Sequence, residues 1–285
     1  MTPRHWFKNG SALRGRIAAL GTGLALVAMG AMTSMPASAQ IAGTKHNLGT
    51  TPGGGVNQFS GTAEICVFCH TPHGADITAT VPLWNRTLPA PASFTTYDSL
   101  GSSTLDGKTA SVGSVSIACL SCHDGVTSMS AVINAPGSGT VGNAAWVAGA
   151  WIGANQVGGK IAPGLITNLG TDLRNDHPIG IQYGGGGITL ALPGAATKDP
   201  DFKTATSSVL GTSRVWWVDT EATPNNTRQK TDMALYTRPA GSYTGQTDAE
   251  PFVECGSCHD PHTTNSTFLR ITNAGSAVCL ACHVK

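Results

Sequence analysis

The eight cysteines of this 285-residue chain form four CxxC pairs, and a histidine follows every pair. The motifs, numbered one to four in chain order, contain Cys66 and Cys69, Cys119 and Cys122, Cys255 and Cys258, and Cys279 and Cys282. C-x-x-C-H is the pattern of covalent c-type haem attachment, in which two thiols bind the porphyrin and the adjacent imidazole binds its iron. The histidines in this proximal position are His70, His123, His259 and His283.

Two other uses of paired cysteines leave these histidines unexplained. A disulfide framework suits an exported protein with an even number of cysteines, but it requires no histidine after each pair. Eight thiolates would complete two tetrahedral zinc sites, so the four histidines would again have no role. The motifs therefore predict four covalently bound c-type haems, which we number as their motifs.

Four further histidines can supply the sixth iron ligands. Apart from the proximal histidines and His5 near the N-terminus, the remaining ones are His46, His73, His177 and His262. Methionine is the competing axial ligand in cytochromes, but beyond residue 39 the chain contains only Met129 and Met233. The number of histidines therefore predicts bis-histidine ligation of every haem iron.

The motifs also form an internal repeat. Residues 66–73 and 255–262 both read CxxCHxPH, whereas residues 119–123 and 279–283 both read CLxCH. Each half of the chain thus contains a free histidine, a CxxCHxPH motif and a CLxCH motif. This order predicts two dihaem modules, at residues 40–165 and 166–285.

The spacing within the repeat limits which histidine binds which haem. His70 and His73 are three residues apart, so on a helical turn they share one face and cannot bind opposite sides of one iron. We therefore expect His73 to bind haem 2 and, by the same reasoning, His262 to bind haem 4. His46 and His177 then remain for haems 1 and 3.

Residues 1–39 have the pattern of a secretory signal peptide. Basic residues precede an apolar run from Ile17 to about Met32, and the small residues 37–39 follow, which predicts cleavage after Ala39. An uncleaved anchor is the alternative, but the run is short for a span of roughly 20 residues. The mature chain from Gln40 has 13 basic and 16 acidic residues, a net charge of −3. We expect it to be exported, to contain no membrane span and to bind no nucleic acid.

The composition predicts little regular structure. Charged residues make up only 12% of the chain, and it contains 36 glycines and 16 prolines. The segments between the motifs are too long for ordinary loops and too polar for separate domains. We expect mostly irregular coil with short helices at the motifs and a few short strands, built around four haems. Some β character is expected at Ser114–Leu120 and Val215–Val218. The tryptophans expected to cover porphyrin faces are Trp146, Trp151, Trp216 and Trp217.

The motifs resemble those of exported multihaem c-type cytochromes of the doubled-CxxCH kind. The KHNL sequence at 45–48 and the NDHP sequence at 175–178 add to this resemblance. Four haems in a coil-rich chain are similar to the tetrahaem outer-surface cytochromes that polymerise into extracellular nanowires in metal-reducing microbes. The resemblance covers four motifs and two histidine segments. It implies a secreted electron-transfer protein, not an enzyme, that forms a head-to-tail homopolymer and exchanges electrons with redox partner proteins and an extracellular acceptor.

Two alternatives remain open at this stage. A soluble periplasmic tetrahaem shuttle is usually lysine-rich around exposed haem edges, whereas the mature chain has seven lysines. A multihaem reductase needs an open iron position, which the number of histidines does not leave. His46 lies six residues after Gln40 on an arm with few apolar residues, so we expect one distal ligand to be supplied between subunits, with His46 as the first candidate donor; the alternative is that His46 binds haem 1 of its own chain. A heterologous contact between subunits propagates as a filament unless it closes.

Overall fold

The computed structural model describes residues 40–137, 151–176 and 178–284. Residues Gln40–Lys285 form one unit by their contacts. The expected signal peptide, Trp146 and His177 lie outside the described residues. Turns, bends and coil predominate in the described part, which confirms the prediction of a largely irregular chain. That part has no helix with the length and apolarity needed to cross a membrane.

Short helices accompany all four CxxCH motifs, as the sequence predicts. They are η2 (Cys66–Phe68), α2 (Ser114–His123), α3 (Cys255–Cys258) and α4 (Ala277–Cys282). The other short helical turns are η1 (Gln40–Gly43), η3 (Pro91–Ser93), η4 (Tyr97–Leu100), η5 (Tyr183–Gly185), η6 (Ser266–Phe268) and η7 (Ala274–Ser276).

The expectation of β character at Ser114–Leu120 is wrong, because these residues begin α2. The alternation of Val115 and Ile117 favours a strand locally, but β propensity depends strongly on packing. The helix buries Ile117 and Leu120, which are three residues apart and so share one face. Burial of this face outweighs the local preference.

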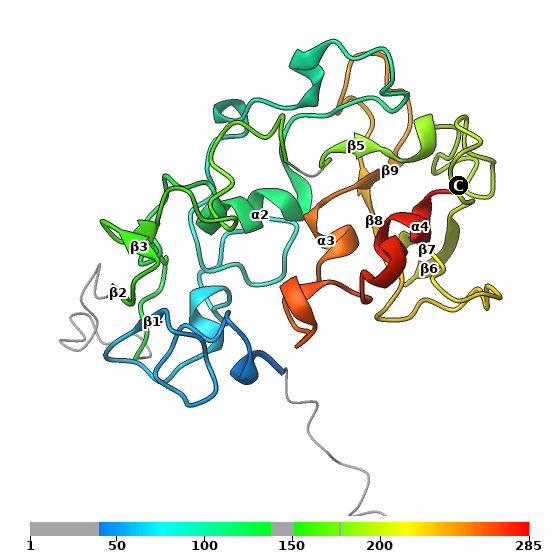
Figure 1. Cartoon of the computed structure of the whole chain (residues 1–285). Helices are drawn as coiled ribbons and strands as arrows, with labels where there is room; N and C mark the ends of the chain where they lie inside the picture. Colours follow the sequence, from blue (N-terminus) through cyan, green and yellow to red (C-terminus); the bar gives the residue numbers. More distant parts are fainter. Residues whose placement is uncertain (1–39, 138–150, 177, 285) are drawn as a thin grey trace, which may run out of the picture. The chain divides into compact units, whose positions relative to one another are not determined.

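A five-stranded antiparallel sheet corrects the expectation of only a few short strands. Its spatial order is β5-β9-β8-β7-β6 (Figure 1). The strands are β5 (Ile181–Gln182), β6 (Thr206–Leu210), β7 (Ser213–Val218), β8 (Met233–Arg238) and β9 (Glu250–Val253). The expected β character at Val215–Val218 is confirmed, since these residues lie in β7.

Two smaller antiparallel pairs complete the strands of the described chain. β1 (Gln58–Phe59) pairs with β2 (Trp151–Ile152), and β3 (Gln156–Val157) pairs with β4 (Lys160–Ile161). The first pair joins segments that are far apart in sequence. It places Phe59 directly opposite Trp151.

Three apolar clusters form the core, and each includes cysteines of the motifs. Cys69 and Cys122 pack against a cluster that contains Phe59, Phe68 and Trp151. The two other clusters are centred on α2, with Cys255 at the edge, and on β7 and β8, with Cys258 and Cys282 at the edge. Of the tryptophans expected to cover haems, Trp216 and Trp217 are fully buried in the sheet and Trp151 is buried in the first cluster. Their role as haem cover stays a prediction.

The two predicted modules share a packed boundary. α2, from the first module, contacts α3 and β8 of the second. Figure 1 shows the three elements side by side. The division at residues 165 and 166 itself stays a prediction.

Candidate haem-binding sites

The thiols are available for covalent attachment. All eight cysteines are free, and each is exposed or half-buried. A c-type haem requires free thiols in pairs, so the chemistry of this donor set fits the group that the motifs predict.

The thiols of consecutive motifs are neighbours. The three neighbouring pairs are Cys69 with Cys122, Cys119 with Cys255, and Cys258 with Cys282. Burial raises the pKa of the Cys69 thiol to about 12, and the adjacent Cys122 raises it further. A hydrogen bond with Cys255 raises the pKa of Cys119 well above its ordinary value. The pKa of Cys282 is raised to about 12 by burial and then by Cys258. The attachment points therefore follow one another in space in chain order.

Three proximal histidines are held in the tautomer that binds a metal. Their Nδ1 atoms lie beside backbone carbonyls, in the pairs His70–Pro82 (2.8 Å), His123–Thr167 (2.7 Å) and His259–Thr267 (2.8 Å). A carbonyl oxygen only accepts, so Nδ1 must carry the proton and donate it. A neutral imidazole protonated at Nδ1 keeps the lone pair of Nε2 for a metal, and metal-binding histidines are commonly oriented in this way.

A returning chain segment holds motifs one, three and four by the same pair of backbone hydrogen bonds. In the first bond, a backbone N–H of the returning segment donates to the carbonyl of the second cysteine. In the second bond, the backbone N–H of the residue after the histidine donates to a carbonyl of the segment. These bonds are Asn85 N to Cys69 O and Thr71 N to Leu83 O; Arg270 N to Cys258 O and Asp260 N to Phe268 O; and Lys203 N to Cys282 O and Val284 N to Asp201 O.

The sequence analysis missed these returning segments. The segment follows the motif in two cases and precedes it in the third, so there is no constant spacing. Leu83 and Phe268 occupy equivalent positions, with φ of 56° and 59°, but neither is a residue type that signals a left-handed turn. The shared arrangement of the returning segments is therefore visible in the hydrogen bonds but has no signal in the sequence.

Two of the predicted distal histidines face proximal histidines. The ring centroids of His46 and His123 are 6.3 Å apart, and those of His70 and His262 are also 6.3 Å apart. A metal–imidazole bond is about 2.0 Å long, so two rings at this separation leave room for a metal ion between them. Each pair would therefore be able to hold one iron.

These pairs differ from those expected from spacing. His46 faces His123 of motif two instead of His70, and His262 faces His70 of motif one instead of His283. The spacing argument excludes two histidines that are three residues apart, such as His259 and His262, as the two ligands of one iron. It does not determine which other haem the second histidine binds. That choice depends on how residues 259–268 fold against the first half of the chain.

Contacts within its own chain hold the His46 ring. It stacks on Phe268, with centroids 4.2 Å apart and an angle of 12° between the ring planes. Burial, followed by the neighbouring His123, lowers the pKa of His46 to about 4, while a hydrogen bond to the Pro261 carbonyl acts in the opposite direction. The N-terminal arm therefore lies against residues of the second half.

His73 and His177 are not brought into such a pair by the described residues. His73 is exposed on the turn after motif one, where Asn134 donates a hydrogen bond of 2.9 Å to its backbone carbonyl. His177 lies outside the described residues. Their roles as distal ligands stay predictions, as do the haem-binding roles of the other histidines.

Comparison with protein families bears on the second half of the chain. The model of the family described as the doubled CXXCH motif matches residues 250–285, which contain motifs three and four. No curated protein matches the chain. The C-terminal region therefore carries the doubled motif of multihaem c-type cytochromes, a class of extracytoplasmic electron carriers that hold c-type haems through CxxCH.

Proposed function

We propose that the mature chain is a tetrahaem c-type cytochrome with bis-histidine ligation, and that it carries electrons as the subunit of an extracellular filament. The bound haems would supply one-electron redox chemistry. The chain's own residues would attach them through eight thiols, orient three of the proximal imidazoles through backbone carbonyls and pack five of the cysteines against apolar clusters. The observation that carries this proposal is that consecutive motifs pack together: Cys69 and Cys122 share one apolar cluster, α2 contacts α3, and Cys258 and Cys282 share another cluster.

Electron transfer is favoured over catalysis by the ring pairs. A reductase needs an iron position that a substrate can reach. Two proximal histidines already face a second imidazole at 6.3 Å, which supports six-coordinate iron at haems 1 and 2. His73 and His177 are the residues proposed to complete haems 3 and 4.

A filament requires one contact that propagates from subunit to subunit. His46 is held against its own chain by Phe268 and Pro261, so it is the weaker candidate for a ligand shared between subunits. His73 is exposed, and we assign that role to it. The alternative is a soluble periplasmic shuttle, in which His73 would bind a haem of its own chain.

Haem content is tested by the intact mass of the protein purified after expression with a c-type haem maturation system. We expect the chain from Gln40 plus four covalent haems, together with low-spin spectra in both oxidation states. A mass equal to that of the bare chain would contradict the proposal. A five-coordinate ferric high-spin signal in the wild type would favour the reductase instead.

Assembly is tested by electron microscopy of material sheared from the cell surface of the native host. Filaments that contain this chain are expected. Monomers confined to the periplasmic fraction would support the shuttle and would leave the haem assignment intact.

A further inference from the structure

Three carboxylates meet at the loop end of the β7–β8 hairpin, where residues 219–232 connect the two strands. The register pairs Val218 with Met233, so the next facing residues are Asp219 and Asp232. Glu221 follows two positions later. One carboxylate oxygen from each of the three acidic residues lies within 4.8 Å of the others. Hairpin register, rather than sequence proximity, thus brings the group together.

The burial of these side chains makes their proximity costly. Asp219 is 5% exposed and Asp232 is 1% exposed. Like charges directly opposite each other on paired strands are destabilising, and a buried carboxylate needs a compensating partner. None of the ion pairs found among the described residues includes any of the three.

Two oxygens of the group lack any partner in the described part of the chain. Asp219 Oδ1 and Glu221 Oε2 are fully buried and accept no hydrogen bond. The other Asp219 oxygen accepts from Thr206 Oγ1 at 3.1 Å, and Asp232 accepts from the backbone N–H of Gln229 at 2.6 Å. Buried acceptors are normally satisfied, so the two orphaned oxygens themselves indicate that a positive ligand belongs at this position.

The ligand atoms define the kind of cation. Oxygen donors without nitrogen or sulfur suit hard cations. Ca²⁺ accepts carboxylates in flexible geometry, whereas Mg²⁺ demands a regular octahedron and retains several waters. We propose that Asp219, Glu221 and Asp232 form a Ca²⁺ site that closes the loop of residues 219–232. Calcium sites in extracellular modules commonly have dissociation constants of about 10⁻⁴–10⁻³ M, and we expect this range.

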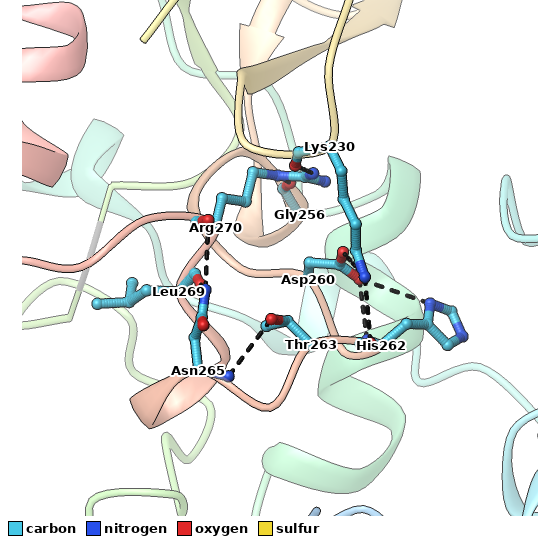
Figure 2. Close-up of polar contacts among 8 residues, drawn as sticks. All are labelled: Lys230, Gly256, Asp260, His262, Thr263, Asn265, Leu269 and Arg270. Carbon is cyan, nitrogen blue, oxygen red and sulfur yellow. Dashed lines mark hydrogen bonds and ion pairs between the residues drawn. The ribbon is translucent and has the colours of Figure 1, made fainter. Parts of the chain in front are cut away.

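The loop connects the calcium site to a predicted haem ligand. Its Lys230 Nζ lies 3.4 Å from Asp260 Oδ2 and donates to the His262 carbonyl at 3.2 Å. Arg270 donates to the Lys230 carbonyl at 2.9 Å. Figure 2 shows these contacts around Lys230, with Asp260 beside the ring and backbone of His262. Bound Ca²⁺ would therefore fix the loop that holds His262, a step that rests on the proposed function.

Calcium binding is tested on the haem-loaded protein by equilibrium dialysis with metal analysis after removal of metals by chelation. We expect one Ca²⁺ per chain at millimolar Ca²⁺, and at least tenfold weaker binding in Asp219→Asn and Asp232→Asn. Asp98→Asn, which removes an exposed carboxylate of η4, is the matched control and should bind as the wild type does. No binding by the wild type, unchanged binding in Asp219→Asn, or equal binding of Mg²⁺ would overturn the site.

Thermal unfolding gives a second readout that does not depend on any haem assignment. Ca²⁺ should raise the wild-type Tm by several degrees, because it binds only the folded state. Without Ca²⁺, Asp219→Asn should be at least as stable as the wild type, since it removes one of the facing charges. A Tm that is lower in Asp219→Asn than in the wild type under these conditions would contradict the repulsion on which the site rests.

Coupling to the haem is a separate measurement. Ca²⁺ removal should increase the high-spin fraction of haem 1 in the wild type and in Asp98→Asn. Binding without this spectral change would overturn the link to His262 and leave the calcium site standing. Failure of the haem stoichiometry would instead contradict the proposed function and with it the coupling to haem 1, and would leave the calcium site standing.

Discussion

The sequence predicts which histidines of this chain could bind haem iron. It does not predict which second histidine lies opposite each of them. The CxxCH pattern identifies the proximal histidines from local sequence, and counting identifies the distal candidates. The ring that faces His262 is that of His70, nearly two hundred residues away in the sequence, and no spacing rule reaches that far. The motif therefore predicts candidate ligands, whereas the pairing of distant rings depends on the fold, and the ligand roles stay predictions.

The ligation of haem 1 is tested by His262→Ala. This substitution should convert one low-spin haem per chain to high-spin, because it removes one ring of the pair that is 6.3 Å apart. The same substitution is then made in a Cys66→Ala, Cys69→Ala background that lacks covalent haem 1. There His262→Ala should add no high-spin haem to the spectrum; a new high-spin signal would assign His262 to haem 4, as the spacing suggested.

Methionine ligation is tested at the two methionines of the mature chain. Met129 is 5% exposed and Met233 is fully buried, and both side chains pack in apolar clusters. Met129→Leu and Met233→Leu conserve volume and should cost less than about 1.5 kcal/mol of stability. Absorption and paramagnetic resonance spectra should stay low-spin and unchanged, and a high-spin signal in either variant would show that methionine binds iron.

At the scale of elements, the sequence predicts structure where the motif dictates it. The short helices follow from CxxCH, and β7 follows from its run of valine and tryptophan. The rest of the sheet was missed because β6 is half-exposed and polar and β5 has only two residues, so neither has a periodic pattern. β5 is stabilised by pairing with β9, and β6 by pairing with β7. Such pairing cannot be predicted from the local sequence pattern of either strand.

Glu254 contacts α2 and β8 from its position before α3, so its substitution tests how strongly these three elements are held together. It precedes α3, accepts a hydrogen bond from Ser116 of α2 and forms a 2.6 Å ion pair with Arg238 of β8. Breaking a buried pair leaves an uncompensated charge and costs about 3–5 kcal/mol. Glu254→Gln should therefore lower the free energy of unfolding by this order in denaturant titrations followed by far-UV circular dichroism.

The control for Glu254 is an exposed ion pair. Asp172 and Arg174 are 2.6 Å apart, but their side chains are 55% and 43% exposed. Exposed pairs contribute little, so Asp172→Asn should leave the unfolding midpoint unchanged. An equal loss of unfolding free energy in Glu254→Gln and Asp172→Asn would mean that only the change in net charge matters. It would contradict the role of Glu254 in joining α2, α3 and β8.

At the scale of the whole molecule, the two halves are joined at the sites themselves. α2 of motif two contacts α3 of motif three, where Cys255 N donates to Ser116 Oγ, and the ring of His262 in the second half faces that of His70 in the first. The internal repeat predicts two similar halves, and the same pair of backbone hydrogen bonds occurs around motifs one, three and four, so the division into two modules stays a prediction. The repeat alone did not predict that histidine rings of the two halves would face each other.

The last prediction concerns the link between subunits, where the same reasoning selects His73 over His46. His46→Ala removes a ring held by Phe268 and facing His123 of its own chain. Filaments should therefore persist and contain one high-spin haem per subunit. His73→Ala removes an exposed imidazole, so filaments should become shorter or disappear, again with one high-spin haem per subunit. Electron microscopy and the high-spin fraction, measured on the same preparation, separate the two roles. Loss of filaments in His46→Ala with intact filaments in His73→Ala would reverse the assignment and make the N-terminal arm the connection between subunits.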